Sequence, residues 1–245
     1  METQCIQEFI KKNLFSIESR IKLAQSRSPN SSESIRLLAV SKHQDLKKIN
    51  ILQDIFKNRN VLLHLGESYA QELKEKKKEL GEGVCFHFIG RIQKNKIRDI
   101  VRYSEVIESV DSKEHAILIN LEGEQLSRKI KIFVQVNISE DEKKAGFNSD
   151  NALNFFTKVL PELKNIEVLG LMTMLKYYEE PESGRKDYAA LRRFRDFLMG
   201  NEAIRKILKR NMLELSMGLS EDFEIAVEEG ATEVRIGTAL FGERS

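Results

Sequence analysis

The segment Ile35-Arg36-Leu37-Leu38-Ala39-Val40-Ser41-Lys42 is an apolar, strand-forming run that ends at a lysine. Similar short apolar runs recur along the chain and alternate with polar helical segments at intervals of roughly 25 to 30 residues, as expected for successive βα units. The predicted strands cover residues 35–42, 61–66, 85–90, 105–110, 131–138, 166–172, 212–217 and 233–239. Eight strands with intervening helices favour an α/β fold of the closed (β/α)8, TIM-barrel type, although periodicity alone also fits an open, doubly wound sheet.

An additional helix is predicted ahead of this alternation, over about residues 3–26. Apolar residues recur there at helical spacing, namely Ile6, Phe9, Ile10, Leu14, Ile17 and Ile21. The segment 26–34, which contains Pro29, ends the helix. Because the chain ends soon after the eighth strand, we expect this helix to pack where the last helix of an ordinary barrel lies. No change of composition divides the chain, so residues 1–245 are expected to form one domain, with the barrel over about 35–244.

Lys42 has the most distinctive chemistry in the first strand. A lysine at the end of a buried strand is partly desolvated, which disfavours its ammonium form and leaves a neutral amine that attacks aldehydes. That is the reactivity of a Schiff-base lysine. Position alone does not establish the role, since most strand-end lysines are solvated.

The far end of the chain strengthens the case for a cofactor site. It reads Leu215-Ser216-Met217-Gly218-Leu219-Ser220 and, further on, Val234-Arg235-Ile236-Gly237-Thr238-Ala239-Leu240-Phe241-Gly242. With Ala39-Val40-Ser41-Lys42, Gly66-Glu67-Ser68-Tyr69-Ala70-Gln71-Glu72 and His87-Phe88-Ile89-Gly90-Arg91-Ile92-Gln93-Lys94-Asn95-Lys96, these segments closely resemble the pyridoxal phosphate homeostasis protein family. The barrel of that family is related to the N-terminal domain of alanine racemases. Several motifs in one order are far more specific than any one of them.

The resemblance implies that the protein binds pyridoxal 5'-phosphate (PLP), with Lys42 as its Schiff-base lysine. Arg235 is then expected to face the pyridine nitrogen, where an always-charged guanidinium discourages protonation and makes the cofactor a weaker electron sink. Ser68 stands where the family usually has asparagine, and it lacks the separate donor and acceptor of an amide. The residues after Lys42, from His43 to Asp45, also depart from the common family pattern.

The phosphate is expected near the ends of strands seven and eight, where barrels often bind phosphate. The candidate residues are Ser216, Met217, Gly237 and Thr238. Gly237 lets the main chain approach an anion, and the hydroxyls of Ser216 and Thr238 can donate to phosphate oxygens. Strand one closes the barrel beside strand eight, which brings Lys42 close to this group. A helix that begins near Ser220 is expected to add its N-terminal field.

Other polar features carry weaker interpretations. The charge run 74–79 is interpreted as a solvated helix face, and Lys94 and Lys96 either meet an anion or partner or are simply solvated. His87 is expected to be a packed structural histidine, and the spacing of His43, His64, His87 and His115 supports no metal site. Helix starts are predicted at Asp45, at a capping box of Asp111 with Glu114, and at Ser220.

Composition narrows the class of protein further. Lysine and arginine number 40 and aspartate and glutamate 38, so a net charge of +2 implies no nucleic-acid partner. Cys5 and Cys85 form no close pair, and residues 1–12 lack the apolar stretch of a signal peptide. No run approaches the roughly 20 apolar residues of a membrane span. A soluble, cytoplasmic protein is expected.

These observations favour a PLP-binding protein of vitamin B6 homeostasis that buffers the cofactor or delivers it to PLP-dependent apo-enzymes, rather than an enzyme. The alternative is an amino-acid racemase of the alanine racemase type. Such racemases use a tyrosine of a second domain as an acid or base, and a chain that ends at Ser245 is expected to have no room for that domain. Without the tyrosine, inversion is expected to be slow. Without the contacts of that domain, the protein is expected to be a monomer. A barrel enzyme for phosphosugars, with Lys42 as an electrostatic group, is a third reading.

Overall fold

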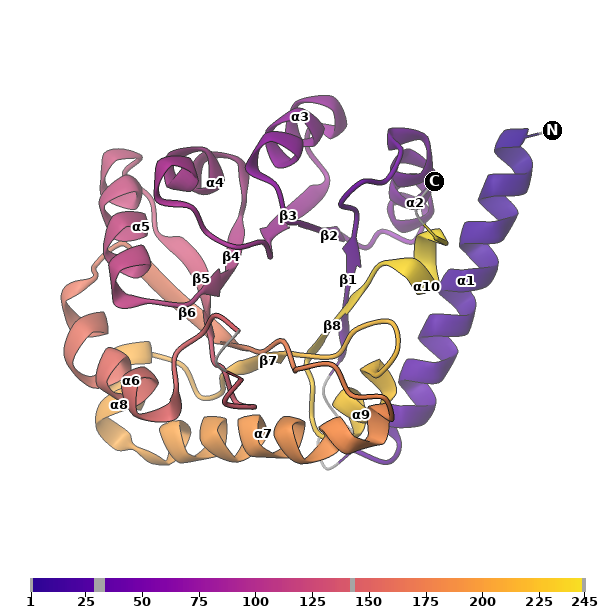
Figure 1. Ribbon diagram of the computed structural model, residues 1–245. Helices are drawn as coiled ribbons and strands as arrows, with labels where there is room; N and C mark the ends of the chain where they lie inside the picture. The colour runs from indigo at the N-terminus through magenta and orange to yellow at the C-terminus, as the bar shows by residue number, and fades with distance from the viewer. Residues whose placement is uncertain (1, 29–33, 142–143, 244–245) are drawn as a thin grey trace.

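The computed structural model describes residues 2–28, 34–141 and 144–243. Within these ranges eight parallel strands form a closed barrel in which β1 pairs with both β2 and β8 (Figure 1). The strands are β1 (Arg36–Val40), β2 (Leu63–Glu67), β3 (Val84–Phe88), β4 (Val106–Val110), β5 (Ile130–Gln135), β6 (Ile166–Met172), β7 (Glu214–Ser216) and β8 (Glu233–Ile236). The predicted (β/α)8 barrel is therefore confirmed. The helix break at Pro29 and the barrel limit at residue 244 lie outside the described residues.

Helices surround the barrel and connect its strands (Figure 1). The α-helices are α1 (Glu2–Gln25), α2 (Leu46–Asn58), α3 (Ala70–Leu80), α4 (Ile97–Tyr103), α5 (Lys113–Gln125), α6 (Ser149–Asn154), α7 (Arg185–Gly200), α8 (Glu202–Leu208), α9 (Phe223–Glu228) and α10 (Thr238–Phe241). Short helical turns complete the set: η1 (Lys94–Lys96), the π-helical η2 (Phe155–Val159), η3 (Leu160–Glu162) and η4 (Pro181–Gly184).

The N-terminal helix α1 packs against α2, α9 and α10, between the ends of the barrel circuit (Figure 1). Its inward face carries Ile10, Leu14 and Ile17, which are fully or almost fully buried. The amide of Asn13 also donates to the carbonyl of Leu240 at 3.0 Å. Since α10 is only a short helix after β8, α1 covers the place of a full eighth helix, as the sequence predicted.

Of the helix starts predicted from the sequence, the one at Asp45 is found in the structure and the capping box at Asp111 is not. Asp45 caps α2 by accepting from the backbone N–H of Lys47, as expected. The cap of α5 is Ser112 and not the neighbouring Asp111, because the Ser112 hydroxyl accepts from the N–H of His115. Asp111 instead contacts the ring of His115 at 2.6 Å, so the predicted capping box does not form.

The barrel interior combines an apolar layer with a charged one. Val106, Phe133, Leu169 and Met172 pack together as a small apolar cluster. The charged and polar group comprises His87, Glu108, Ser216, Glu233 and Arg235, all at most 3% exposed. Because side chains alternate along a strand, Glu233, Arg235 and Gly237 follow one another up the inner face of β8. This alternation places Arg235 just below the carboxyl-terminal mouth.

Candidate functional site

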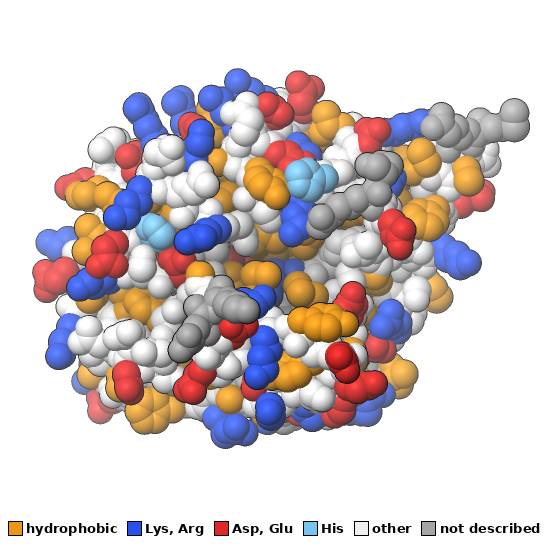
Figure 2. Space-filling view, in the orientation of Figure 1, with side chains coloured by type: hydrophobic (Ala, Val, Ile, Leu, Met, Phe, Trp, Pro, Cys, Tyr) orange, Lys and Arg blue, Asp and Glu red, His pale blue; other side chains and the backbone are white. Residues whose placement is uncertain are grey.

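A cavity of about 380 Å³ opens at the carboxyl ends of the strands. It is lined by four of the predicted site residues, Lys42, Arg235, Gly237 and Thr238, together with Ser220. Figure 2 shows this face hollowed near its centre, with lysine and arginine side chains around the hollow. Lys42 follows β1 and Gly237 follows β8, and the two strands are hydrogen-bonded neighbours. Barrel closure thus brings together residues almost two hundred positions apart.

The half-buried Lys42 sits on a segment that a buried ion pair holds in place. The Ser41 hydroxyl donates to Glu67 at 2.5 Å, and the ammonium of Lys76 donates to the Ser41 carbonyl and to Glu67. Lys76 also contacts Glu72 at 2.7 Å. Burial raises the pKa of Glu67, and the charge of Lys76 only partly offsets this.

The reading of 74–79 as a wholly solvated face was wrong at Lys76. Its side chain is 5% exposed, because it turns under the Ser41–Lys42 segment and meets two carboxylates there. Burying such a charge is tolerated only when it is paired and hydrogen-bonded. The composition of a helical charge run cannot reveal which member turns inward.

Arg235 is fixed at the floor of the cavity. Its Nη1 donates to both the carbonyl and the hydroxyl of Ser216, each at 2.7 Å, and its Nη2 donates to the Thr173 carbonyl at 2.6 Å. Arg235 is 3% exposed yet lines the cavity. A guanidinium held by three hydrogen bonds presents its charge in one fixed orientation.

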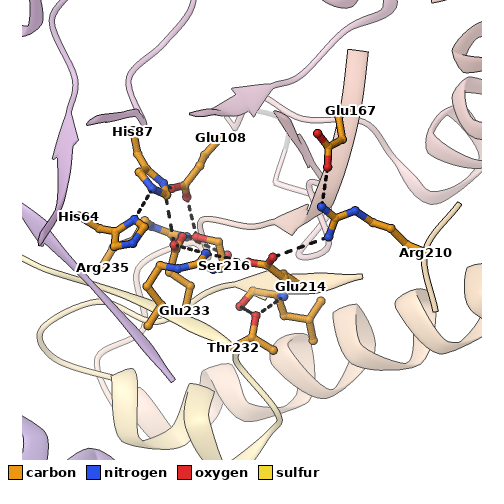
Figure 3. A network of polar contacts seen from close by, with 12 residues as sticks. His64, His87, Glu108, Glu167, Arg210, Glu214, Ser216, Thr232, Glu233 and Arg235 are labelled. Carbon is orange, nitrogen blue, oxygen red and sulfur yellow. Dashed lines mark hydrogen bonds and ion pairs between the residues drawn. The ribbon is translucent and has the colours of Figure 1, made fainter. Parts of the chain in front are cut away.

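Ser216 and Met217 lie elsewhere than the sequence predicted. Both are fully buried and neither lines the cavity. The Ser216 hydroxyl points into the barrel, donates to Glu108 at 2.6 Å and accepts from Arg235 (Figure 3). Met217 belongs to the apolar core. In this structure the Ser216 hydroxyl therefore orients Arg235 and lies outside the lining of the cavity.

Beneath Arg235 the polar network continues through two histidines (Figure 3). His87 Nδ1 is 2.5 Å from Glu108, and His87 Nε2 is 2.9 Å from His64 Nδ1. Burial lowers the pKa of His87, but the charge of Glu233 and the hydrogen bond with Glu108 raise it more, to about 10. Burial and the charge of His87 lower the pKa of His64 to about 4. The prediction that His87 is a packed, hydrogen-bonded histidine is confirmed.

The Glu108 carboxylate joins these histidines to the cavity floor. Burial raises its pKa, but the hydrogen bond and charge of His87 and the charge of Arg235 lower it more, so the net shift is downward. Glu108 was not recognised in the sequence, since an acidic residue within an otherwise apolar strand was the only available signal. Its ionised form is held between His87 and Ser216.

Ser220 is a second residue that sequence reasoning placed wrongly. It was expected to begin a helix, but α9 begins at Phe223. The Ser220 hydroxyl oxygen instead accepts from the backbone N–H groups of Gly237 and Ala239, each at 3.3 Å. These two amides therefore converge on one oxygen atom at the rim of the cavity. Gly218 makes this loop possible, because it adopts φ +95° and a Cβ there would lie 2.6 Å from the Cβ of Ala226.

A second lobe of about 820 Å³ shares Lys42 and Arg235 with the first cavity. Ser68 lies in this lobe, on the opposite side of Lys42 from Thr238. Gly90 allows the close approach there, because a Cβ at this position would lie 2.0 Å from the Ser68 carbonyl oxygen. Of the basic pair singled out in the sequence, Lys96 lines the lobe.

Comparison with known proteins agrees with this geometry. A profile of the family described as "Alanine racemase, N-terminal domain" matches residues 13–245. The fold and the cavity thus define a barrel of the alanine racemase N-terminal type. Within that class, the chain is 39% identical to the pyridoxal phosphate homeostasis protein of Aquifex aeolicus over 73% of this chain and 76% of the relative. The chain belongs to the pyridoxal phosphate homeostasis protein family.

Two further relatives span nearly the whole chain. The pyridoxal phosphate homeostasis protein of Caenorhabditis elegans is 32% identical over 97% of each chain. PipY of Synechococcus elongatus, whose structure was solved with PLP bound, is 28% identical with a TM-score of 0.76 and covers 95% of this chain and all of its own. The likeness therefore extends over both the barrel and the N-terminal helix.

Proposed function

We propose that this protein acts in PLP homeostasis, holding the cofactor on Lys42 and handing it on to PLP-dependent apo-enzymes. The observation that carries the proposal is the single cavity in which Lys42 meets Arg235 and the Gly237–Thr238 turn. Family membership supports it, as does the PLP bound by PipY. When bound, PLP supplies a reactive aldehyde and an electron-withdrawing ring.

The residues of the cavity fit such a group. The Ser220 hydroxyl accepts from the N–H groups of Gly237 and Ala239, and its own proton can donate to an anionic oxygen at the rim of the cavity. The exposed Thr238 hydroxyl lies beside them and can donate to the same anion. The amine of Lys42 would take the aldehyde carbon, and Arg235 would face the ring with a fixed positive charge that keeps a proton off the pyridine nitrogen.

A carrier role is favoured over racemisation by the state of the tyrosines around the cavity. Tyr178 donates to Asp187 at 2.6 Å, and Tyr188 donates to Asp222 at 2.7 Å. Burial and the neighbouring carboxylate raise the pKa of Tyr178 to about 12, and the same causes raise the pKa of Tyr188. The hydroxyl protons of Tyr178 and Tyr188 are thus already donated to carboxylates and are harder to remove than usual, which makes these two tyrosines poor partners in proton exchange, whereas inversion needs a proton acceptor on one face and a donor on the other.

Two assays on one preparation test the carrier role. PLP-loaded protein should activate an added apo-enzyme that needs PLP, while Lys42→Ala prepared in the same way should not. In deuterated water the loaded protein should exchange the α-proton of L-alanine negligibly, because a missing positioned acid or base costs about 10² to 10⁴ in rate. Rapid formation of D-alanine that Lys42→Ala abolishes would support the racemase instead.

A reducing compartment suits the chain, and we propose the cytoplasm. Cys5 and Cys85 are both free thiols, as is usual for proteins kept reduced. Among the helices of the described ranges, none has the length and apolar character needed to cross a membrane.

A further inference from the structure

In the barrel interior, below the cavity that contains Lys42, three side chains that bind metals in other proteins converge. Cys85 and His87 are two positions apart on β3 and therefore share the inner face of the strand. His64 on β2 is the register partner of Cys85. One donor atom from each of the three residues lies within 4.8 Å of the other two.

We propose that His64, Cys85 and His87 form a binding site for Zn²⁺ or a metal ion of similar softness. Leu38 is the register partner of His64, so the site lies about four residues below Lys42 along β1, or roughly 13 Å at the strand rise. The site uses none of the residues that line the cofactor cavity, and Glu108 and Ser216 connect it to Arg235 at the cavity floor.

The donor set matches the chemistry of zinc. Two imidazole nitrogens and a thiolate are preferred zinc ligands, at about 2.0 to 2.1 Å from nitrogen and about 2.3 Å from sulfur. Tetrahedral donors then stand roughly 3.3 to 3.8 Å apart. His64 Nδ1 and His87 Nε2 are 2.9 Å apart and share one proton. A metal ion would replace that proton and the thiol proton of Cys85, so the two rings need to separate by only a few tenths of an ångström.

The surroundings orient His87 for this role. Its other nitrogen, Nδ1, is 2.5 Å from Glu108, and metal-binding histidines usually donate that second N–H to a carboxylate. Glu233 is fully buried with one oxygen 3.8 Å from the same nitrogen, and its Oε1 has no hydrogen-bond partner among the described residues. Both carboxylates favour a cation beside His87. Arg36, which pairs with Glu233 at 3.1 Å, and Arg235, whose charge acts on Glu108, are competing positive charges.

A second grouping of possible ligands, His87 with Glu108 and Glu233, is less suitable. All three residues are fully buried, and Glu108 already accepts from Ser216. His64 and Cys85 are only half-buried, which gives access from the amino-terminal mouth of the barrel. The set of His64, Cys85 and His87, which includes the softer thiolate donor, is therefore the proposed site.

Titration of the purified full-length protein with Co²⁺ under reducing conditions tests the proposed metal site. We expect one Co²⁺ per chain with a thiolate-to-metal charge-transfer band, which Zn²⁺ then displaces. Cys85→Ser should lose the band, whereas Cys5→Ser, which removes the exposed cysteine, should keep it. Glu108→Gln should weaken Co²⁺ binding about 10- to 100-fold, the usual effect of losing a carboxylate behind a ligating histidine.

A measurement on the wild-type protein avoids reliance on variants that fold poorly. Zn²⁺ should slow alkylation of Cys85 by a maleimide, measured by peptide mass spectrometry, while Cys5 in the same sample reacts at an unchanged rate. Equal rates at Cys85 with and without Zn²⁺, or a cobalt band that survives Cys85→Ser, would overturn the proposal.

Discussion

The guanidinium of Arg235 and the hydroxyl of Ser216 are joined at 2.7 Å, and the same hydroxyl donates to Glu108 at 2.6 Å. A serine expected at the phosphate thus links a buried carboxylate to the arginine under the cavity. The consequence is that the orientation of Arg235 depends on groups that lie outside the lining of the cavity.

Ser216→Ala should therefore lower the free energy of unfolding and also remove one of the hydrogen bonds that orient Arg235. The change leaves one oxygen of the buried Glu108 without its donor, which costs about 1 to 3 kcal/mol in the free energy of unfolding. The affinity for PLP and the affinity for pyridoxal, which lacks the phosphate, should fall by similar factors, because Arg235 is proposed to face the pyridine ring and both ligands have that ring. Urea unfolding and ligand titration measure both effects.

Ser104→Ala is the matched control. Ser104 is equally buried and donates to the Ile100 carbonyl, far from Arg235. Ser104→Ala should lower the free energy of unfolding without changing the affinity for PLP or for pyridoxal. A loss confined to PLP in Ser216→Ala would instead return Ser216 to the phosphate site.

The phosphate contacts are tested by the double change of Ser220→Ala and Thr238→Val. A hydrogen bond to a charged group is worth about 1.5 to 3 kcal/mol, so affinity for PLP should fall at least about tenfold. Pyridoxal, titrated in parallel, should bind almost as well as it does to the wild type. Equal losses for the two ligands would show that these hydroxyls do not contact the phosphate.

Acid stability depends in part on the contact of α1 and α7 with α9. Burial raises the pKa of Glu228, but hydrogen bonds and charges from Arg185 and Arg27 lower it more, so its folded pKa lies below its usual 4.5. A carboxyl with a lowered folded pKa stabilises the fold above the unfolded pKa, and this stabilisation is lost as pH falls through the folded value.

Glu228→Gln should accordingly be less stable than the wild type at pH 7, by about 1 kcal/mol, with the difference shrinking below about pH 4.5. Urea unfolding over a pH series measures this. Glu202→Gln, which removes an exposed partner of Lys206, should have little effect at any pH. A Glu228→Gln difference that stays constant down to acid pH would exclude the linkage.

The strands and the meeting of Lys42 with Gly237 and Thr238 were predictable because apolar runs mark strands and barrel closure joins the first to the last. The direction of individual side chains was not. Ser216 lies at the end of β7, yet whether it points into the barrel or towards the mouth depends on the register with β6 and β8. The inward turn of Lys76 likewise depends on Glu67, a residue of another element.

The convergence of His64, Cys85 and His87 was also invisible in the linear sequence. His64 and Cys85 are 21 positions apart, but pairing of β2 with β3 places them side by side. The two-residue spacing of Cys85 and His87 was visible in the sequence, but the proximity of His64 follows only from the pairing of β2 with β3. Ser220 was misread for a related reason, since its partners Gly237 and Ala239 lie at the junction of β8 and α10, far away in the sequence.

Borohydride reduction of the PLP-loaded protein, followed by peptide mass mapping, shows which lysine holds PLP. We expect a pyridoxyl group on Lys42, its loss in Lys42→Ala, and its retention in Lys176→Ala, a control that removes another lysine lining the same cavity. A pyridoxyl group found mainly on any other lysine of the wild-type protein would contradict the proposal that Lys42 holds PLP.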